Sequence, residues 1–211
     1  MTILELLDYA AIALFAGTGA LSASRKQLDL VGFVFLAAVA GIGGGTLRDV
    51  ILGALPVFWV KNPDYVMVCV AAGVLVYFTA HFFESRYRIL LWLDAAGMAA
   101  YAALGAAKGL VATGSPTVAI VTGMLTATFG GVLRDIVAGE PSVLLRPEIY
   151  VSAALAGSGV FTAANALGFS QMICFAAATL TAFVIRGGAL RYGWCFPVYK
   201  ARPGRDPKDV M

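Results

Sequence analysis

The chain has 211 residues, of which 60% are hydrophobic and only 13% are charged, and its mean hydropathy is +0.85. Soluble domains are roughly half apolar and about a quarter charged, so this composition excludes an ordinary soluble protein. The formal net charge of +3 is compatible with attraction to anionic lipid and does not require a nucleic-acid partner. The composition therefore predicts an integral membrane protein.

Seven apolar segments follow one another along the chain, and each is long enough to cross a hydrocarbon core of about 30 Å as a helix. The first segment has no Lys or Arg before it and carries Glu5 and Asp8, so we expect it to stay rather than to be cleaved as a signal peptide. Residues 1–195 are expected to form one all-α membrane domain, followed by a polar tail at 196–211. The predicted spans are 3–23, 28–53, 65–83, 89–107, 117–138, 149–169 and 171–190.

The basic residues predict how the chain is oriented in the membrane. With the N-terminus outside, twelve of the fifteen Lys and Arg residues fall in inner segments, and only Arg48, Lys61 and Lys108 fall outside. Cytoplasmic loops carry the excess of Lys and Arg in membrane proteins. The sequence therefore predicts a multi-pass protein of the inner (plasma) membrane, with an outer N-terminus and a cytoplasmic C-terminus.

The sequence repeats itself at an offset of 86 residues. Residues 44–53 (GGTLRDVILG) align with residues 130–139 (GGVLRDIVAG), and Asp8 and Gly19 align with Asp94 and Gly105. Each repeat, at about 1–85 and 86–169, holds three predicted spans, and a seventh helix follows at about 171–190. Because three is odd, the two repeats must cross the membrane in opposite senses, which is an arrangement common in transporters.

Glycines gather in the middle of the second span (Gly43, Gly44 and Gly45) and of the fifth span (Gly130 and Gly131). Each interior Gly costs a helix about 1 kcal/mol relative to Ala. We therefore expect both helices to break or kink there, with half-helix ends whose carbonyls favour a cation. Close packing of neighbouring helices is the alternative explanation of the same glycines.

Six charged residues lie in or beside the predicted spans. Ionisable groups in a span usually face the bundle interior or an aqueous cavity and pair with one another, which marks a pathway. Structural salt bridges at helix ends are the alternative. The six residues are Asp8, Arg48, Asp49, Asp94, Arg134 and Asp135. In the predicted topology the first three of them form an outer vestibule and the last three form an inner one.

At these residues the chain resembles the prokaryotic TRIC family, the trimeric intracellular cation channels. The resemblance covers nearly the whole chain and rests on the doubled pattern at 43–49 (GGGTLRD) and 129–135 (FGGVLRD), with Phe129 standing where the first repeat has Gly43. It implies a homotrimer surrounded by membrane lipid, with a water-filled pore in each protomer. Potassium and other monovalent cations such as sodium would pass through the kinked helices.

Other functions share part of this pattern. A secondary transporter of glycine or another small solute would use the same inverted repeats as rocking halves. A membrane enzyme or a purely structural bundle has less support, since His81 is the only histidine and the three cysteines lack metal-ligand spacing. We therefore expect no enzymatic activity, no cofactor and no metal. The sequence also lacks the TVGYG filter, so modest selectivity between potassium and sodium is expected.

Overall fold

The computed structural model describes residues 3–82, 85–145 and 148–197, and these residues form an all-helical membrane protein. Six helices are long and apolar enough to cross a membrane, and α7 is a shorter apolar helix of 16 residues. The seven predicted crossings are thus confirmed, although α7 is shorter than the predicted span at 149–169. The predicted tail lies outside the described residues from 198 onward. The helices are α1 (Ile3–Arg25), α2 (Leu30–Ile51), α3 (Phe58–Lys61), α4 (Asp64–Thr79), α5 (Arg86–Thr113), α6 (Pro116–Val137), α7 (Val151–Ala166) and α8 (Gln171–Tyr192), with short 3-10 turns η1 (Ala80–Phe82) and η2 (Val143–Leu145).

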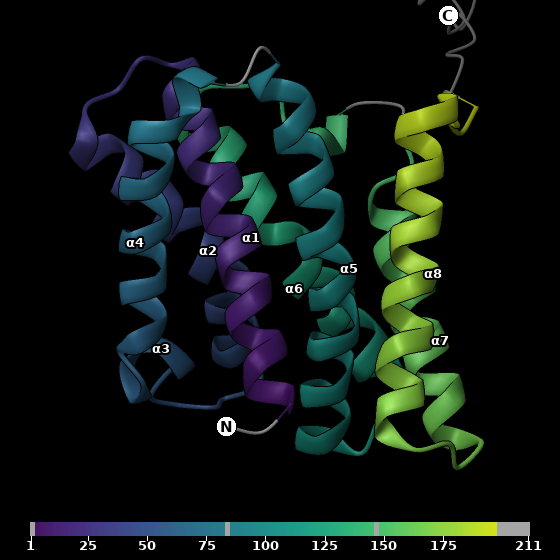
Figure 1. Cartoon of the computed structure of the whole chain (residues 1–211). Helices are drawn as coiled ribbons and strands as arrows, with labels where there is room; N and C mark the ends of the chain where they lie inside the picture. Colours follow the sequence, from purple (N-terminus) through teal and green to yellow (C-terminus); the bar gives the residue numbers. More distant parts are fainter. Residues whose placement is uncertain (1–2, 83–84, 146–147, 198–211) are drawn as a thin grey trace, which may run out of the picture.

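The long helices run roughly side by side, and the two repeats form neighbouring halves of the bundle (Figure 1). Helices α1, α2 and α4 form the first half and α5, α6 and α7 the second, while α8 packs against α7 and α5. The halves meet where α1 packs on α5 and α2 packs on α6. In Figure 1, α1 begins at the lower end and α5 at the upper end, so the repeats are inverted as expected.

Helices α2 and α6 begin and end in the same way. The side chains of Asp29 and Ser115, which are 86 positions apart, each accept a hydrogen bond from the backbone N–H three residues later. Such caps satisfy N–H groups that have no partner inside the helix. Just beyond the other ends, Gly53 and Gly139 have φ angles of +66° and +62°, which favour glycine. The local signals of the repeat therefore produce two equivalent helices.

The expected breaks in these two helices are wrong. Helix α2 continues without interruption through Gly43–Gly45, and α6 continues through Gly130 and Gly131. No half-helix ends in the middle of either segment, so the predicted free carbonyl ends are absent from these two helices. A bend at these glycines remains a prediction.

Two of these glycines instead permit close contact between α2 and α6. A Cβ atom on Gly44 would lie 2.2 Å from the carbonyl oxygen of Thr126, and one on Gly130 would lie 2.5 Å from that of Ala40. The two contacts are equivalent, because both members of one are 86 positions from the members of the other. Small residues let helix backbones approach closely in membranes, where packing drives association. The α2–α6 crossing thus lies near the pseudo-two-fold axis.

Substituting Gly44 by Ala tests this crossing. The added methyl group meets backbone that cannot move aside, so we expect the free energy of unfolding to fall by about 1–3 kcal/mol. Denaturation in detergent micelles measures the change. Gly159 is the matched control, because it lies within a helix and nothing lies within 4 Å of an added Cβ. Gly159→Ala should leave stability unchanged or raise it by up to about 1 kcal/mol; equal losses would contradict the tight crossing.

Candidate functional site

Four charged residues lie together at the lower end of the bundle, and we call them the lower cluster: Asp8, Arg48, Asp49 and Lys108. Arg48, on the last turns of α2, donates to Oδ1 of Asp49 from Nε at 2.9 Å and from Nη2 at 2.7 Å. The other carboxylate oxygen of Asp49 accepts the N–H of Phe58 at 2.8 Å. Asp49 therefore holds both Arg48 and the start of α3.

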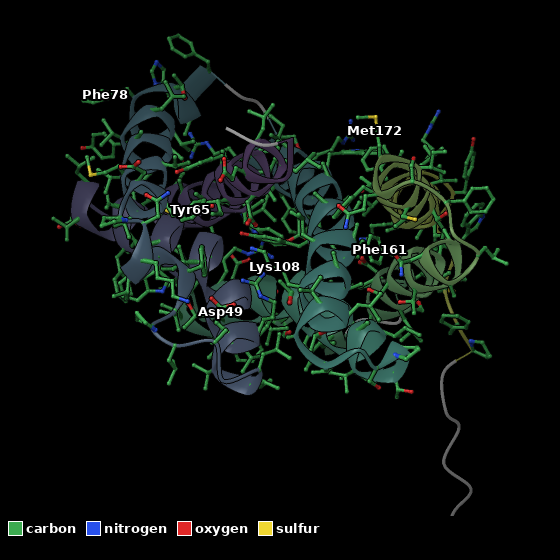
Figure 2. All side chains as sticks on the ribbon, turned by 90° about the horizontal axis from the view of Figure 1, so that it is seen from below. Asp49, Tyr65, Phe78, Lys108, Phe161 and Met172 are labelled. Atoms are coloured by element: carbon green, nitrogen blue, oxygen red, sulfur yellow. The ribbon has the colours of Figure 1, made fainter. Side chains whose placement is uncertain are left out.

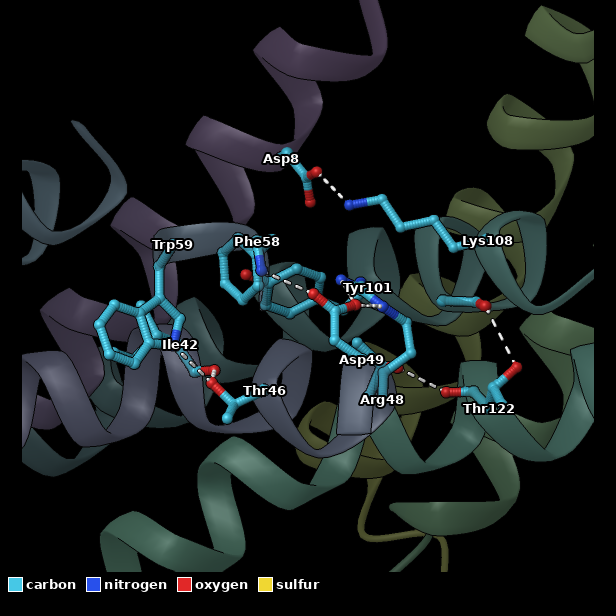
Figure 3. Close-up of polar contacts among 12 residues, drawn as sticks. Asp8, Ile42, Thr46, Arg48, Asp49, Phe58, Trp59, Tyr101, Lys108 and Thr122 are labelled. Carbon is cyan, nitrogen blue, oxygen red and sulfur yellow. Dashed lines mark hydrogen bonds and ion pairs between the residues drawn. The ribbon is translucent and has the colours of Figure 1, made fainter. Parts of the chain in front are cut away.

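The second ion pair of the lower cluster joins α1 to α5. Lys108 donates from Nζ to Oδ2 of Asp8, and Figure 3 shows its side chain extending across the gap between the two helices. Seen from below, Asp49 and Lys108 lie near the middle of the bundle, whereas Phe78 and Met172 lie at its edge (Figure 2). The side chain of Lys108 is 37% exposed. The lower cluster is therefore central but not sealed.

A pocket of about 720 Å³ opens beside the lower cluster. Its lining includes Phe58 and Tyr65, which border the cluster, and three charged residues, the acidic Glu5 and Asp64 and the basic Lys61. The guanidinium of Arg48 and the ammonium of Lys108 also lie over the Phe58 ring, at 5.7 and 5.9 Å from its centroid. Acidic groups around such a mouth raise the local concentration of cations.

The upper cluster, formed by Thr18, Asp94, Arg134 and Asp135, has Arg134 at its centre. Its guanidinium donates to Asp94 at 2.8 Å, to Asp135 at 2.9 Å and to the Thr18 hydroxyl at 2.9 Å. Arg134 and Asp94 are each only 1% exposed. Asp135 also accepts the N–H of Val143 at 3.0 Å, as Asp49 accepts that of Phe58. One arginine thus ties α6 to α1 and α5.

The two clusters are related by the repeat but differ in one partner. Asp8 and Asp94 occupy equivalent positions, yet Asp94 pairs with Arg134 of its own repeat, whereas Asp8 pairs with Lys108 of the other repeat. Arg48 consequently has only Asp49 as a charged partner among the described residues. The upper cluster is closed, and the lower cluster has the partly exposed ammonium of Lys108 at its edge.

All six charged residues predicted from the sequence are buried, and the structure brings them together in two groups of three. A role in an ion pathway remains a prediction for each. Glycines make room beside the groups, because a Cβ on Gly45 would meet the Phe58 ring and one on Gly131 would meet the Tyr150 hydroxyl. In the described part of the chain, no three His, Cys, Asp or Glu residues converge to hold a metal ion.

Sequence reasoning missed several members of this network. Lys108 and Thr18 complete the clusters, but they were not singled out. Arg186, on α8, is fully buried, donates to the Ile149 carbonyl at 3.2 Å and lies 5.0 Å from the centroid of the Tyr150 ring. Lys108 and Arg186 were detectable as charges within apolar helices, whereas Thr18 gave no signal. Only the fold brings them together.

Comparison of the sequence with known families and proteins agrees with the repeat. The family model described as Glycine transporter matches residues 5–81 and 91–166. A UPF0126 membrane protein of Vibrio cholerae is 35% identical over 202 residues, which cover 94% of this chain and 83% of that protein. The UPF0126 inner membrane protein YadS of Escherichia coli is 33% identical over 199 residues, covering 92% and 94% of the two chains.

Solved structures show the same fold. A TRIC trimeric intracellular cation channel orthologue from Rhodobacter sphaeroides matches with a TM-score of 0.90 at 47% identity, and the match covers 92% of this chain and 100% of that one. A second TRIC cation channel matches with a TM-score of 0.86 at 27% identity, covering 96% and 100%. The likeness extends over all three helices of each repeat and α8.

Replacing Arg134 by Met tests the central role of this arginine. Two buried carboxylates then lose their counter-ion, so we expect the free energy of unfolding to fall by about 3–5 kcal/mol. Denaturation in detergent micelles again gives the measurement. Arg25→Met is the control, since its pair with Glu140 is partly exposed and should be worth at most about 1 kcal/mol. Similar losses in both variants would show that the upper cluster is no special anchor.

Proposed function

The chain belongs to the glycine transporter family, to which the TRIC cation channels are related, and from this membership we propose that it is a monovalent-cation channel with a pore through each protomer. The observation that carries the proposal is the pair of charged clusters. One lies at the C-terminal end of α2 and the other at the C-terminal end of α6, at opposite ends of the bundle. Charges buried within one apolar bundle, on facing helices, typically mark a pathway. The route would run among α1, α2, α5 and α6, past both clusters.

The permeating ion follows from the chemistry along this route. Carboxylates lie at both ends, and neither cluster offers a ring of backbone carbonyls such as a potassium filter uses. Selectivity between potassium and sodium would therefore be modest, and both ions would pass. Potassium would be the main permeating ion because of its abundance in the cell. Bending of α2 at Gly43–Gly45 and of α6 at Gly130 and Gly131 would separate the tight crossing and open the route.

Assembly and orientation complete the proposal. Because TRIC channels matched here are trimeric by name, we expect a homotrimer of this chain in which each protomer conducts independently. The excess of Lys and Arg near the upper end supports a cytoplasmic location for that end. The lower cluster and its pocket would then face outward, and the closed upper cluster would face the cytoplasm. Lipid would surround the apolar outer face.

A second candidate function is secondary transport of glycine or another small solute. The difference between the clusters favours it, because one end is closed around Arg134 while the other has the partly exposed Lys108. Inverted repeats that adopt different arrangements on the two sides of a membrane are typical of alternating access. The family model's description points in the same direction.

Flux through purified protein in liposomes or planar bilayers separates the two functions, with Lys108→Gln as the informative variant. Removing a positive charge from the route should raise potassium conductance about fivefold, from about 1 kcal/mol of repulsion at aqueous dielectric. Lys26→Gln removes the same charge from an exposed position just beyond α1, outside both clusters and the pocket, and should change conductance little. Absence of discrete potassium steps, together with saturable uptake of labelled glycine, would reject the channel and favour the transporter.

Thiol labelling tests the proposed orientation without adding a tag. Cys195 is exposed just beyond α8, whereas Cys69 and Cys174 are buried. A membrane-impermeant maleimide should therefore label the native chain in inside-out vesicles and leave it unlabelled in intact spheroplasts. A Lys61→Cys substitution in a Cys195→Ser background should show the opposite pattern. Labelling of Cys195 from outside would invert the proposed topology.

A further inference from the structure

The upper cluster carries an unbalanced negative charge. In the lower cluster, two cations face the two carboxylates of Asp8 and Asp49. In the upper cluster, Arg134 alone faces Asp94 and Asp135, and Arg134 and Asp94 are almost fully buried. A buried charge without a counter-ion is strongly unfavourable in a membrane protein. The upper cluster therefore lacks one positive charge.

The repeat identifies where that charge belongs. Lys108 of α5 reaches Asp8 of α1 in the lower cluster. At the offset of 86, Asp8 corresponds to Asp94 and Lys108 corresponds to Ser22. Because the inverted repeat exchanges α1 with α5, Ser22 occupies on α1 the place that Lys108 occupies on α5. Ser22 also lies one turn beyond Thr18, which contacts Arg134.

Unpartnered oxygens gather at this place. Among the described residues, Oδ2 of Asp94 and Oγ of Ser22 have no hydrogen-bond partner, although both residues are 0–1% exposed. A Cβ on Gly131 would meet both the Tyr150 hydroxyl, at 2.7 Å, and Asp94, at 3.2 Å, so these two groups converge. Buried polar atoms without a partner indicate a bound water or ion. A water would supply hydrogen bonds but no charge.

Two other arginines in the described part of this end, Arg186 and Arg86, do not supply the missing charge. Arg186 is paired with Glu148 at 2.9 Å, so the pair is neutral. Arg86 donates instead to the carbonyl oxygens of Ala80 and Ser24, at 3.0 and 3.5 Å. Neither guanidinium forms an ion pair with Asp94 or Asp135 in the described part of the chain.

We propose that the upper cluster binds a monovalent cation through Asp94 Oδ2 and Ser22 Oγ, beside the Tyr150 hydroxyl, where the lower cluster has the ammonium of Lys108. One carboxylate and neutral hydroxyls match a single positive charge, whereas a divalent ion would reverse the imbalance. Binding of the cation is a property of the cluster itself. Its role as a stopping point for a permeating ion rests on the proposed channel function.

Thermal unfolding of the full chain in detergent tests binding without measuring flux. The wild type is compared in potassium and in N-methyl-D-glucamine, a cation too large for the site, at equal ionic strength. We expect potassium to raise the midpoint by roughly 5 °C at saturation, because a ligand that binds only the folded state stabilises it. Equal midpoints in the two salts would overturn the proposal.

Two reciprocal substitutions test the location. Ser22→Lys places an ammonium at the proposed site, so the potassium response should disappear. Because Ser22 is buried and this variant could fail to fold, Lys108→Ser is the second arm: it makes the lower cluster resemble the upper one and should enlarge the potassium response. Lys26→Ser, at an exposed lysine, should leave the response unchanged. A Lys108→Ser variant that responds like the wild type would refute the location.

The remaining outcomes separate this proposal from its alternatives and from the channel function. Midpoints that follow pH and ignore potassium would assign the missing charge to a proton on Asp94 or Asp135, which would reject the cation site. A chain that shows the potassium response but conducts no ion would refute the channel and leave the site standing. A conducting chain without the response would refute the site alone.

Discussion

Close contact between the backbones of α2 and α6 is the packing constraint on which the arrangement of the two Arg-Asp pairs depends. Gly44 and Gly130 bring the two helices together at the centre, and because the repeats are inverted, the last turns of these helices lie at opposite ends of the bundle (Figure 1). Each of these turns carries an Arg-Asp pair, and each Asp also holds the N–H that begins the next short helical turn. A bulkier side chain at either glycine would separate the helices, because the contact is with backbone.

The inverted repeat places similar chemistry at both ends, and its departures from symmetry are where function is expected. Arg134 bridges Asp94, Asp135 and Thr18, so the upper end is closed by a network with almost no exposed surface. The lower end uses Lys108 from the other repeat and keeps an open edge. Ion pairs withdrawn from water are held by geometry and mutual hydrogen bonding, so the different partners of Asp8 and Asp94 give the two ends different exposure.

The glycine-rich segments illustrate how a correct motif led to a wrong local structure. The sequence shows that glycines recur in the middle of two apolar spans, and helix propensity alone predicts weak points there. The structure retains continuous helices because close packing at the crossing offsets the propensity cost. Packing against a partner helix depends on which surface faces which, and a single sequence does not state that.

The sequence by itself determined the apolar spans, the repeat at an offset of 86, the inversion of its halves and the six charged residues of the interior. These follow from local composition and counting, which need no knowledge of contacts. Only the tertiary structure decided that Asp8 pairs with Lys108 while Asp94 pairs with Arg134, and that Thr18 and Arg186 join the upper end. Those pairings join helices far apart in the chain, so they depend on how the helices pack.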